Sequence, residues 1–179
     1  AGEILSFLHP WLQDAGASSS LGLWHDGEWW RPLTALFLHA DLQHLGGNAL
    51  AALCFAPLVC RQVGVVRGWG LILLCGTLAN AATSWIMLPE PYESIGASTA
   101  TFAALGLLSG LGLTLLLRHG ARLTILRQLA PVIAGVILLA MLGSGSGDGR
   151  TDVLAHCVGY GFGLVAGTLH GLLRRRPQV

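Results

Sequence analysis

Ser98 and His156 each lie near the start of an apolar segment, and together their side chains could perform acyl transfer. A serine hydroxyl becomes a nucleophile when a nearby histidine takes its proton. Both residues are expected slightly below the outer boundary of a membrane-spanning helix, at matching depth. A lone serine in such a place commonly bonds a carbonyl of its own helix, so the interpretation depends on its setting.

The setting of Ser98 favours chemistry. The chain turns there from a loop into a helix, and the first N–H groups of a helix have no partner within it. The helix dipole is also positive at that end. An oxyanion that forms beside Ser98 would therefore find hydrogen-bond donors.

A second polar pair, His44 and Asn48, is spaced four residues apart. On a helix this spacing places both side chains on one face, where both can donate to a shared spot. Gly46 and Gly47 between them would let another backbone approach. Taken alone, the pair is better explained by an interhelical hydrogen bond without chemistry.

His156 begins a stripe of small residues that continues with Gly159, Gly163 and Gly167. Such a stripe indicates a helix packed closely against a neighbour. The predicted span that begins at Ser98 suits this neighbour, because alanines make its first turns narrow. These alanines are Ala97, Ala100, Ala103 and Ala104.

The elements that carry these residues are expected to lie in a membrane. Of the 179 residues, 53% are hydrophobic and 11% are charged, whereas about a quarter of the residues in soluble domains are charged. The mean hydropathy is +0.64, and the net charge of +1 gives no indication of nucleic-acid binding. A spanning helix needs about 20 apolar residues. Five spans are predicted, at about His44–Cys60 (entered from about Thr34), Gly68–Leu88, Ser98–Leu117, Leu126–Leu142 and Val153–Leu173.

The charges separate across this map. All ten basic residues are arginines, and eight of them fall on one side: Arg61, Arg67, Arg118, Arg122, Arg127, Arg174, Arg175 and Arg176. The other side holds Arg31, Arg150 and every acidic residue: Glu3, Asp14, Asp26, Glu28, Asp41, Glu90, Glu93, Asp148 and Asp152. Because arginine-rich loops are cytoplasmic, residues 174–179 are predicted to be a cytoplasmic tail.

The whole chain, 1–179, is predicted to be one transmembrane domain, with residues 1–41 as an external first loop and five spans in residues 42–173. The first loop contains Trp11, Trp24, Trp29 and Trp30. It is expected either to lie partly in the membrane interface or to pack as an ordinary external loop. The four cysteines have neither zinc-site nor disulfide spacing. No metal or other cofactor is implied.

The stretch "EWWRPLTALFLHADLQHLGGN" resembles the first-loop element of the rhomboid family of intramembrane serine proteases. It contains the family's tryptophan–arginine pair, here Trp30 and Arg31. It also contains the family's histidine–x4–histidine–x3–asparagine pattern, here His39, His44 and Asn48.

Two further stretches extend the resemblance from about Glu28 to Gly167. "GAST" is similar to the family's Gly-x-Ser element, with Gly96 followed by Ser98, and "AHCVGYGFGLVAG" is similar to its terminal element, with His156 and Gly159. The family usually has glycine after the serine, where this chain has Thr99. It commonly has a tyrosine that stacks on the histidine, where this chain has Phe102, and phenylalanine can still stack.

The resemblance implies an all-α polytopic helix bundle that cleaves transmembrane segments of membrane proteins. Its substrates would be single transmembrane segments with small or helix-breaking residues near the outer membrane face. Ser98 would be the nucleophile and His156 the base of a dyad, with His44, Asn48 and the Ser98 N–H around the oxyanion. Supporting roles fall to Trp30, Arg31, His39, Gly96, Phe102 and Gly159. Substrates would enter laterally past the fourth span, whose Pro131 and Gly135 weaken its helix.

The family core has six spans, so a sixth is expected before Ala1, and the protein is expected in a bacterial inner membrane. Two other interpretations stay open at this stage. One is an inactive rhomboid-like protein that binds membrane helices without cutting them. The other is a transporter or haem-carrying electron-transfer protein that uses His44 and His156 as ligands, although this leaves Ser98 and Asn48 unexplained.

Overall fold

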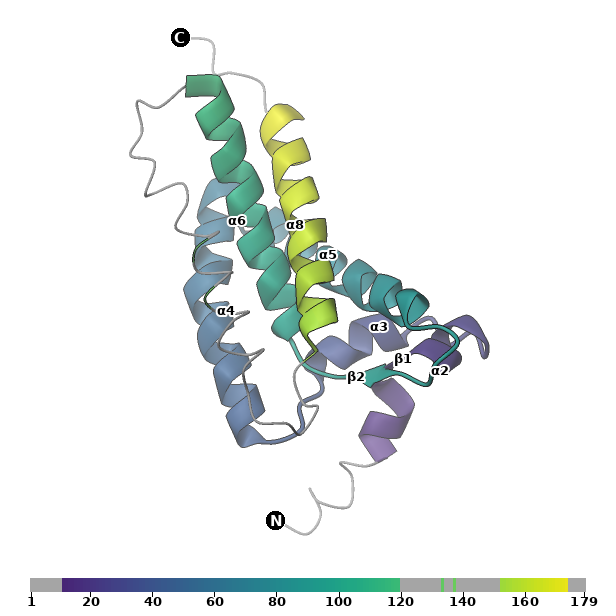
Figure 1. Ribbon diagram of the computed structural model, residues 1–179. Helices are drawn as coiled ribbons and strands as arrows, with labels where there is room; N and C mark the ends of the chain where they lie inside the picture. Colours follow the sequence, from purple (N-terminus) through teal and green to yellow (C-terminus); the bar gives the residue numbers. More distant parts are fainter. Residues whose placement is uncertain (1–10, 120–132, 134–136, 138–151, 174–179) are drawn as a thin grey trace.

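Long helices dominate the computed structural model, which describes residues 11–119, 133, 137 and 152–173 (Figure 1). Within these residues four helices are long and apolar enough to cross a membrane. They are α4 (Leu42–Val63), α5 (Val65–Ile86), α6 (Ser98–His119) and α8 (Val153–Leu173). The predicted fourth span, 126–142, lies outside the described residues apart from helical positions 133 and 137.

The first two spans begin earlier than predicted, and the first is longer. Asp41 caps α4, because its Oδ1 accepts from the backbone N–H of His44 at 2.7 Å. Gly64, at φ +93°, both ends α4 and precedes α5. The stretch between the first two predicted spans, 61–67, is therefore helical apart from Gly64. Arg61 and Arg67 lie at the end of α4 and α5 opposite Asp41, in agreement with the predicted charge separation.

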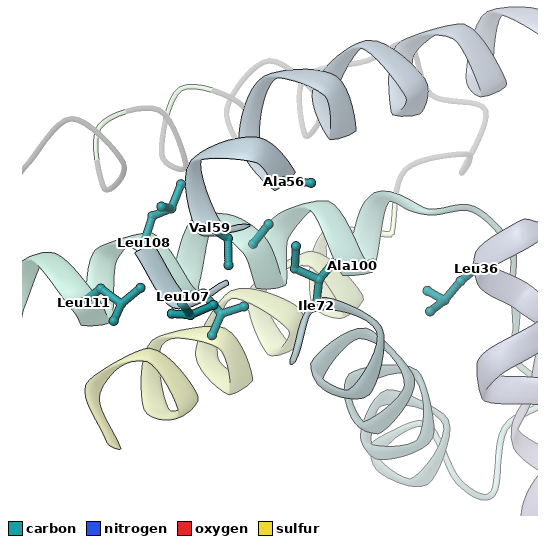
Figure 2. Close-up of a cluster of buried hydrophobic side chains, with 10 residues drawn as sticks. Leu36, Ala56, Val59, Ile72, Ala100, Leu107, Leu108 and Leu111 are labelled. Atoms are coloured by element: carbon teal, nitrogen blue, oxygen red, sulfur yellow. The ribbon is translucent and has the colours of Figure 1, made fainter. Parts of the chain in front are cut away.

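Helix α6 is the most buried of the four long helices and contacts the other three (Figure 1). One of its faces, with Ala104, Leu107 and Leu111, joins Val59 of α4 and Ile72 of α5 in a cluster of buried side chains (Figure 2). This core holds the middle of α6 in place and leaves its N-terminal end, at Ser98, near the first loop.

The interface of α6 with α8 is built on glycines, as the stripe predicts. A Cβ added to Gly163 would lie 2.0 Å from the carbonyl oxygen of Ala103, and one added to Gly167 would lie 2.3 Å from that of Leu107. Glycines of α6 contribute in return, since a Cβ on Gly106 would lie 2.1 Å from the carbonyl oxygen of Tyr160. Only glycine allows these backbones to come so close.

Two other groups of small residues have different surroundings. Ala100 of α6 packs against α5, since its Cα lies 2.9 Å from the position of a Cβ on Gly76. In α4, a Cβ on Gly46 or Gly47 would meet no atom of the described residues within 4 Å. The close backbone expected beside these two glycines therefore does not come from the described part of the chain.

Residues 11–41 form a structured segment at the end of the bundle where α4, α6 and α8 begin (Figure 1). Residues 11–16 are helical. They are followed by β1 (Ser18–Ser19), α2 (Ser20–Trp24), α3 (Arg31–Thr34) and the 3-10 helix η1 (Ala35–Phe37). The two-residue strand β1 pairs antiparallel with β2 (Glu93–Ser94), the strand between α5 and α6.

Buried polar contacts attach this segment to α5. The hydroxyls of Ser18 and Ser84 are 3.0 Å apart, and Nδ2 of Asn80 donates to the carbonyl of Pro32 at 2.9 Å. The tryptophan side chains instead lie exposed, including 65% of Trp11 and of Trp29. The segment thus combines a packed polar side with an exposed aromatic side.

Candidate active site

The predicted nucleophile and base lie within hydrogen-bonding distance. Oγ of Ser98, in the first turn of α6, is 2.8 Å from Nε2 of His156, in the first turns of α8. The imidazole is buried, with 4% of its residue surface exposed, whereas Ser98 is half-buried and reaches a cavity. A buried histidine that bonds a serine at the edge of a cavity is suited to take the proton of that serine.

The turn before Ser98 depends on Gly96. Its φ of +122° is a conformation that side-chain-bearing residues rarely adopt. Its N–H donates to the carbonyl of Ala35 at 2.8 Å, and the next N–H, of Ala97, donates to Nε2 of His39 at 3.5 Å. Two residues of the first loop therefore hold the backbone that presents the serine.

His44 and Asn48 converge on the same glycine. A Cβ on Gly96 would lie 2.6 Å from Nε2 of His44 and 3.4 Å from Nδ2 of Asn48. Both side chains line a cavity of about 910 Å³ that also contains Ser98 and His156. Nδ2 of Asn48 is buried and has no hydrogen-bond acceptor among the described residues. The amide of Asn48 is therefore an available N–H donor beside Gly96, which precedes Ser98 by two residues.

The His156 ring is oriented mainly from α6. It stacks on Phe102, with ring centroids 4.5 Å apart and planes at 21°. Within the described residues its Nδ1 has no hydrogen-bond partner. Among the described residues, the serine and histidine therefore form a pair without a carboxylate on the far nitrogen.

Trp30 and Arg31, the tryptophan–arginine pair of the first loop, do not line this cavity. Nε of Arg31 donates to Glu28, and its Nη1 donates to the carbonyl of Ala17 at 3.1 Å. Nε1 of Trp30 donates to the carbonyl of Ala15 at 3.1 Å. Their contacts stabilise the first loop, which in turn holds Gly96.

The residues that line the cavity but were not predicted as part of the site include Tyr92 and Asp152. The hydroxyl of Tyr92 donates to Oδ2 of Asp152, whose Oδ1 accepts from the N–H of Ala155 at 2.9 Å. The position of Asp152 directly before an apolar run is a helix N-cap signal. Nothing in the local sequence of Tyr92 indicates its partner, which is 60 residues away.

Residues 26–172 match the model of the Rhomboid domain family. The chain belongs to the rhomboid family. The all-α rhomboid-like membrane bundle predicted from the sequence is thereby confirmed, with the short β1–β2 pair as an addition. Four of the five predicted spans are described, and the predicted fourth span, 126–142, lies outside the described residues apart from positions 133 and 137.

Individual relatives agree with this assignment. The chain is 33% identical over 107 residues to the putative rhomboid protease YdcA of Bacillus subtilis, which covers 54% of this chain and 53% of that protein. It is 34% identical to the rhomboid protease GluP of Bacillus subtilis, over 82% of this chain and 27% of that protein. It is 32% identical to RHOMBOID-like protein 2 of Arabidopsis thaliana, over 93% of this chain and 49% of that protein. This rhomboid thus matches about half the length of these relatives or less.

Proposed function

We propose that this rhomboid is an intramembrane serine endopeptidase that uses Ser98 and His156 as a catalytic dyad. The observation that carries the proposal is the 2.8 Å contact between Ser98 Oγ and His156 Nε2 at a cavity lined also by Asn48. Relatives that bear the name rhomboid protease support the same class of reaction. The inactive alternative has no observation in its favour, because both dyad side chains are present and in contact.

In this reaction Ser98 Oγ attacks the scissile carbonyl while Nε2 of His156 takes the hydroxyl proton. The carbonyl oxygen becomes an oxyanion, which the Nδ2 amide of Asn48, the imidazole of His44 and the first N–H groups of α6 would stabilise. The C–N bond then breaks, and the imidazolium gives its proton to the leaving amine. Water, activated in turn by His156, hydrolyses the acyl-enzyme and regenerates Ser98.

The substrates would be transmembrane segments that reach the cavity near one face of the membrane. The cavity lies at the heads of α4, α6 and α8, where the acidic residues Asp41, Glu93 and Asp152 line it. The arginines Arg61 and Arg67 lie at the other end of the bundle. Since arginine-rich ends are cytoplasmic, the active site would face the outside of the bacterial inner membrane and the C-terminus the cytoplasm. Lateral access past residues 126–142 stays a prediction, since they lie outside the described residues.

The test is covalent labelling by a fluorophosphonate together with cleavage of a model transmembrane substrate. Ser98→Ala should abolish labelling, and Ser98→Ala and His156→Ala should each reduce turnover more than about a thousandfold. Matched controls lie deeper on the same helices: Ser109→Ala on α6 and His170→Ala on α8 should retain both signals. Labelling that persists in Ser98→Ala, or a folded wild-type protein that neither labels nor cleaves, would overturn the proposal.

A further inference from the structure

A second contact inside the cavity joins the two halves of the site. The hydroxyl of Tyr92, from the segment between α5 and α6, donates to Oδ2 of Asp152, which immediately precedes α8. Both residues line the cavity that holds Ser98 and His156. Tyr92 precedes Ser98 by six residues, and Asp152 precedes His156 by four. The contact therefore links the segment that leads into the serine with the helix that carries the histidine.

Tyr92 is held in place through its backbone, independently of its side chain. Its N–H donates to Oγ of Ser20 at 3.1 Å, and its carbonyl accepts from the N–H of Ser20 at 3.0 Å. Ser20 is fully buried, and its hydroxyl donates to the carbonyl of Glu90 at 2.8 Å. The phenol ring thus extends towards α8 from a fixed point of the first loop.

Asp152 organises the first turn of α8. Its Oδ1 accepts from the N–H of Ala155 at 2.9 Å, as a helix N-cap does. Its backbone carbonyl accepts from the N–H of His156 at 3.1 Å. The second carboxylate oxygen is the one that binds Tyr92. A movement of Asp152 relative to Tyr92 would consequently move the turn that carries His156.

The surroundings of Tyr92 preserve its role as a donor. Burial raises the pKa of Tyr92, and the negative charge of Asp152 raises it further. The phenol therefore keeps its proton throughout the neutral range, and its hydrogen bond to the carboxylate is charge-assisted.

We propose that Tyr92 and Asp152 are positioning residues that set the relation between the nucleophile and the base. The inference rests on the proposed function, because it concerns the same reaction. From α6, the imidazole of His156 receives the contacts of Ser98 and Phe102. Within the described residues its Nδ1 has no partner, so the Tyr92–Asp152 contact supplies orientation from the α8 side. Small displacements of reacting groups are costly in rate.

The first test removes one hydroxyl. Tyr92→Phe keeps the ring and loses the donor, and Tyr160→Phe is the matched control. Tyr160 is the only other tyrosine of the chain, and its hydroxyl donates to Ser109 at 3.0 Å. In Tyr92→Phe, kcat should fall about tenfold, with KM within about twofold and a melting temperature near that of the wild type. An unchanged kcat, or a loss that the unfolded fraction explains, would overturn the proposal.

The second test varies the acceptor. Asparagine caps helices about as well as aspartate, so Asp152→Asn should retain more turnover than Asp152→Ala. Asp26→Asn, at an exposed aspartate, controls for the loss of charge. The double variant Tyr92→Phe/Asp152→Ala should be no slower than Asp152→Ala alone, because both changes break one contact. Losses that multiply would show two independent roles and contradict the proposal.

A third measurement needs no activity. The difference in tyrosinate absorbance between wild type and Tyr92→Phe isolates the titration of Tyr92. It should lie above the ordinary value of about 10 and move down in Asp152→Ala. If Tyr92 titrates at the ordinary pKa, the contact with Asp152 is absent in the protein, and this inference is wrong whatever the activity. A raised titration in a protein without Ser98-dependent turnover would instead overturn the proposed function and hence the catalytic role of the contact.

Discussion

The ring of Phe102 stacks on the imidazole of His156, with centroids 4.5 Å apart and planes at 21°. Phe102 is almost completely buried and lies one turn after Ser98 on α6. The same helix therefore supplies both the hydroxyl that binds the imidazole and the surface on which it rests. This arrangement restricts rotation of the ring about its χ2 angle and keeps Nε2 directed at the serine.

Replacement of Phe102 should consequently lower kcat by more than the loss of folded protein explains. Aromatic pairs are worth about 0.5–1.5 kcal/mol beyond their buried area. Phe102→Leu should thus lower kcat by up to about tenfold. Phe102→Tyr keeps the ring and should keep most of the activity. Turnover and melting temperature, measured on one preparation, check this, and a Phe102→Leu variant with full turnover would contradict it.

Thr99, which follows the nucleophile, should be tolerated. Its side chain is buried and directed at α8, where its Cγ2 lies 3.1 Å from the position of a Cβ on Gly159. Thr99→Gly should change turnover by less than about tenfold, or 1.4 kcal/mol of barrier. It should lower the melting temperature, because it leaves a gap against α8. A gain of several hundredfold in turnover would show instead that the threonine obstructs the site.

The glycine stripe offers a pair of matched variants on α8. A Cβ on Gly163 would lie 2.0 Å from the carbonyl oxygen of Ala103, whereas one on Gly161 would meet no atom of the described residues within 4 Å. Gly163→Ala should destabilise the protein by about 1–3 kcal/mol or more, the usual cost of overpacking. Gly161→Ala should be neutral or slightly stabilising. Equal melting temperatures of the two variants would contradict the interface described here.

The approach of Ser98 to His156 could be anticipated from the sequence because it depends on local regularities. Helical periodicity places the glycines that follow His156 on one face, and that face requires a narrow partner. The helix of Ser98 is narrow, so the N-terminal ends of the two helices come together. The same periodicity places His44 and Asn48 together on α4, although it does not reveal that both point at Gly96.

The remaining features depend on contacts between distant segments. The Tyr92–Asp152 contact and the pairing of Ser20 with Tyr92 join residues 60 and 72 positions apart, and neither has a local signature. The docking of Asn80 on Pro32 is similar, since a buried asparagine in a span does not indicate which carbonyl it binds. The single-residue connection between α4 and α5 was not predicted, because Arg61 and Arg67 interrupt the apolar runs, although Gly64 alone separates the two helices.

Acid should destabilise the protein through His39. Burial lowers the pKa of His39, and the nearby His44 lowers it further, against a backbone hydrogen bond at Phe37 that raises it. The unfolded chain therefore takes up the proton first as the pH falls. The stabilising contribution is present above the ordinary pKa of about 6.5 and is lost as the pH falls through the folded value. Protonation also removes the acceptor for the N–H of Ala97.

The check on His39 is the melting temperature as a function of pH. His39→Gln offers an amide oxygen to Ala97 and does not titrate, so its melting temperature should fall less below about pH 6.5 than that of the wild type. His25→Gln is the control, because His25 is exposed and contacts only the neighbouring Asp26 among the interactions described. Parallel curves for wild type and His39→Gln would contradict the assignment.

The two buried asparagines should separate catalysis from stability. Nδ2 of Asn80 donates to the carbonyl of Pro32 at 2.9 Å, whereas Nδ2 of Asn48 faces the cavity without an acceptor in the described part of the chain. If Asn48 binds an oxyanion, it acts on charge that exists only in the transition state. Asn48→Ala should then lower kcat by about 10²–10³-fold, as the loss of one oxyanion donor does, with KM and melting temperature nearly unchanged.

Asn80→Ala should do the opposite. It leaves the carbonyl of Pro32 without its donor and should lower the melting temperature, at a cost of about 1–3 kcal/mol, while the folded fraction keeps its kcat. Both variants are measured for kcat, KM and melting temperature on the same preparations. Asparagine does not titrate, so the pH profile of the dyad stays readable in each. If Asn48→Ala instead melts many degrees lower and turns over normally in its folded fraction, Asn48 is a structural residue and its place at the oxyanion is wrong.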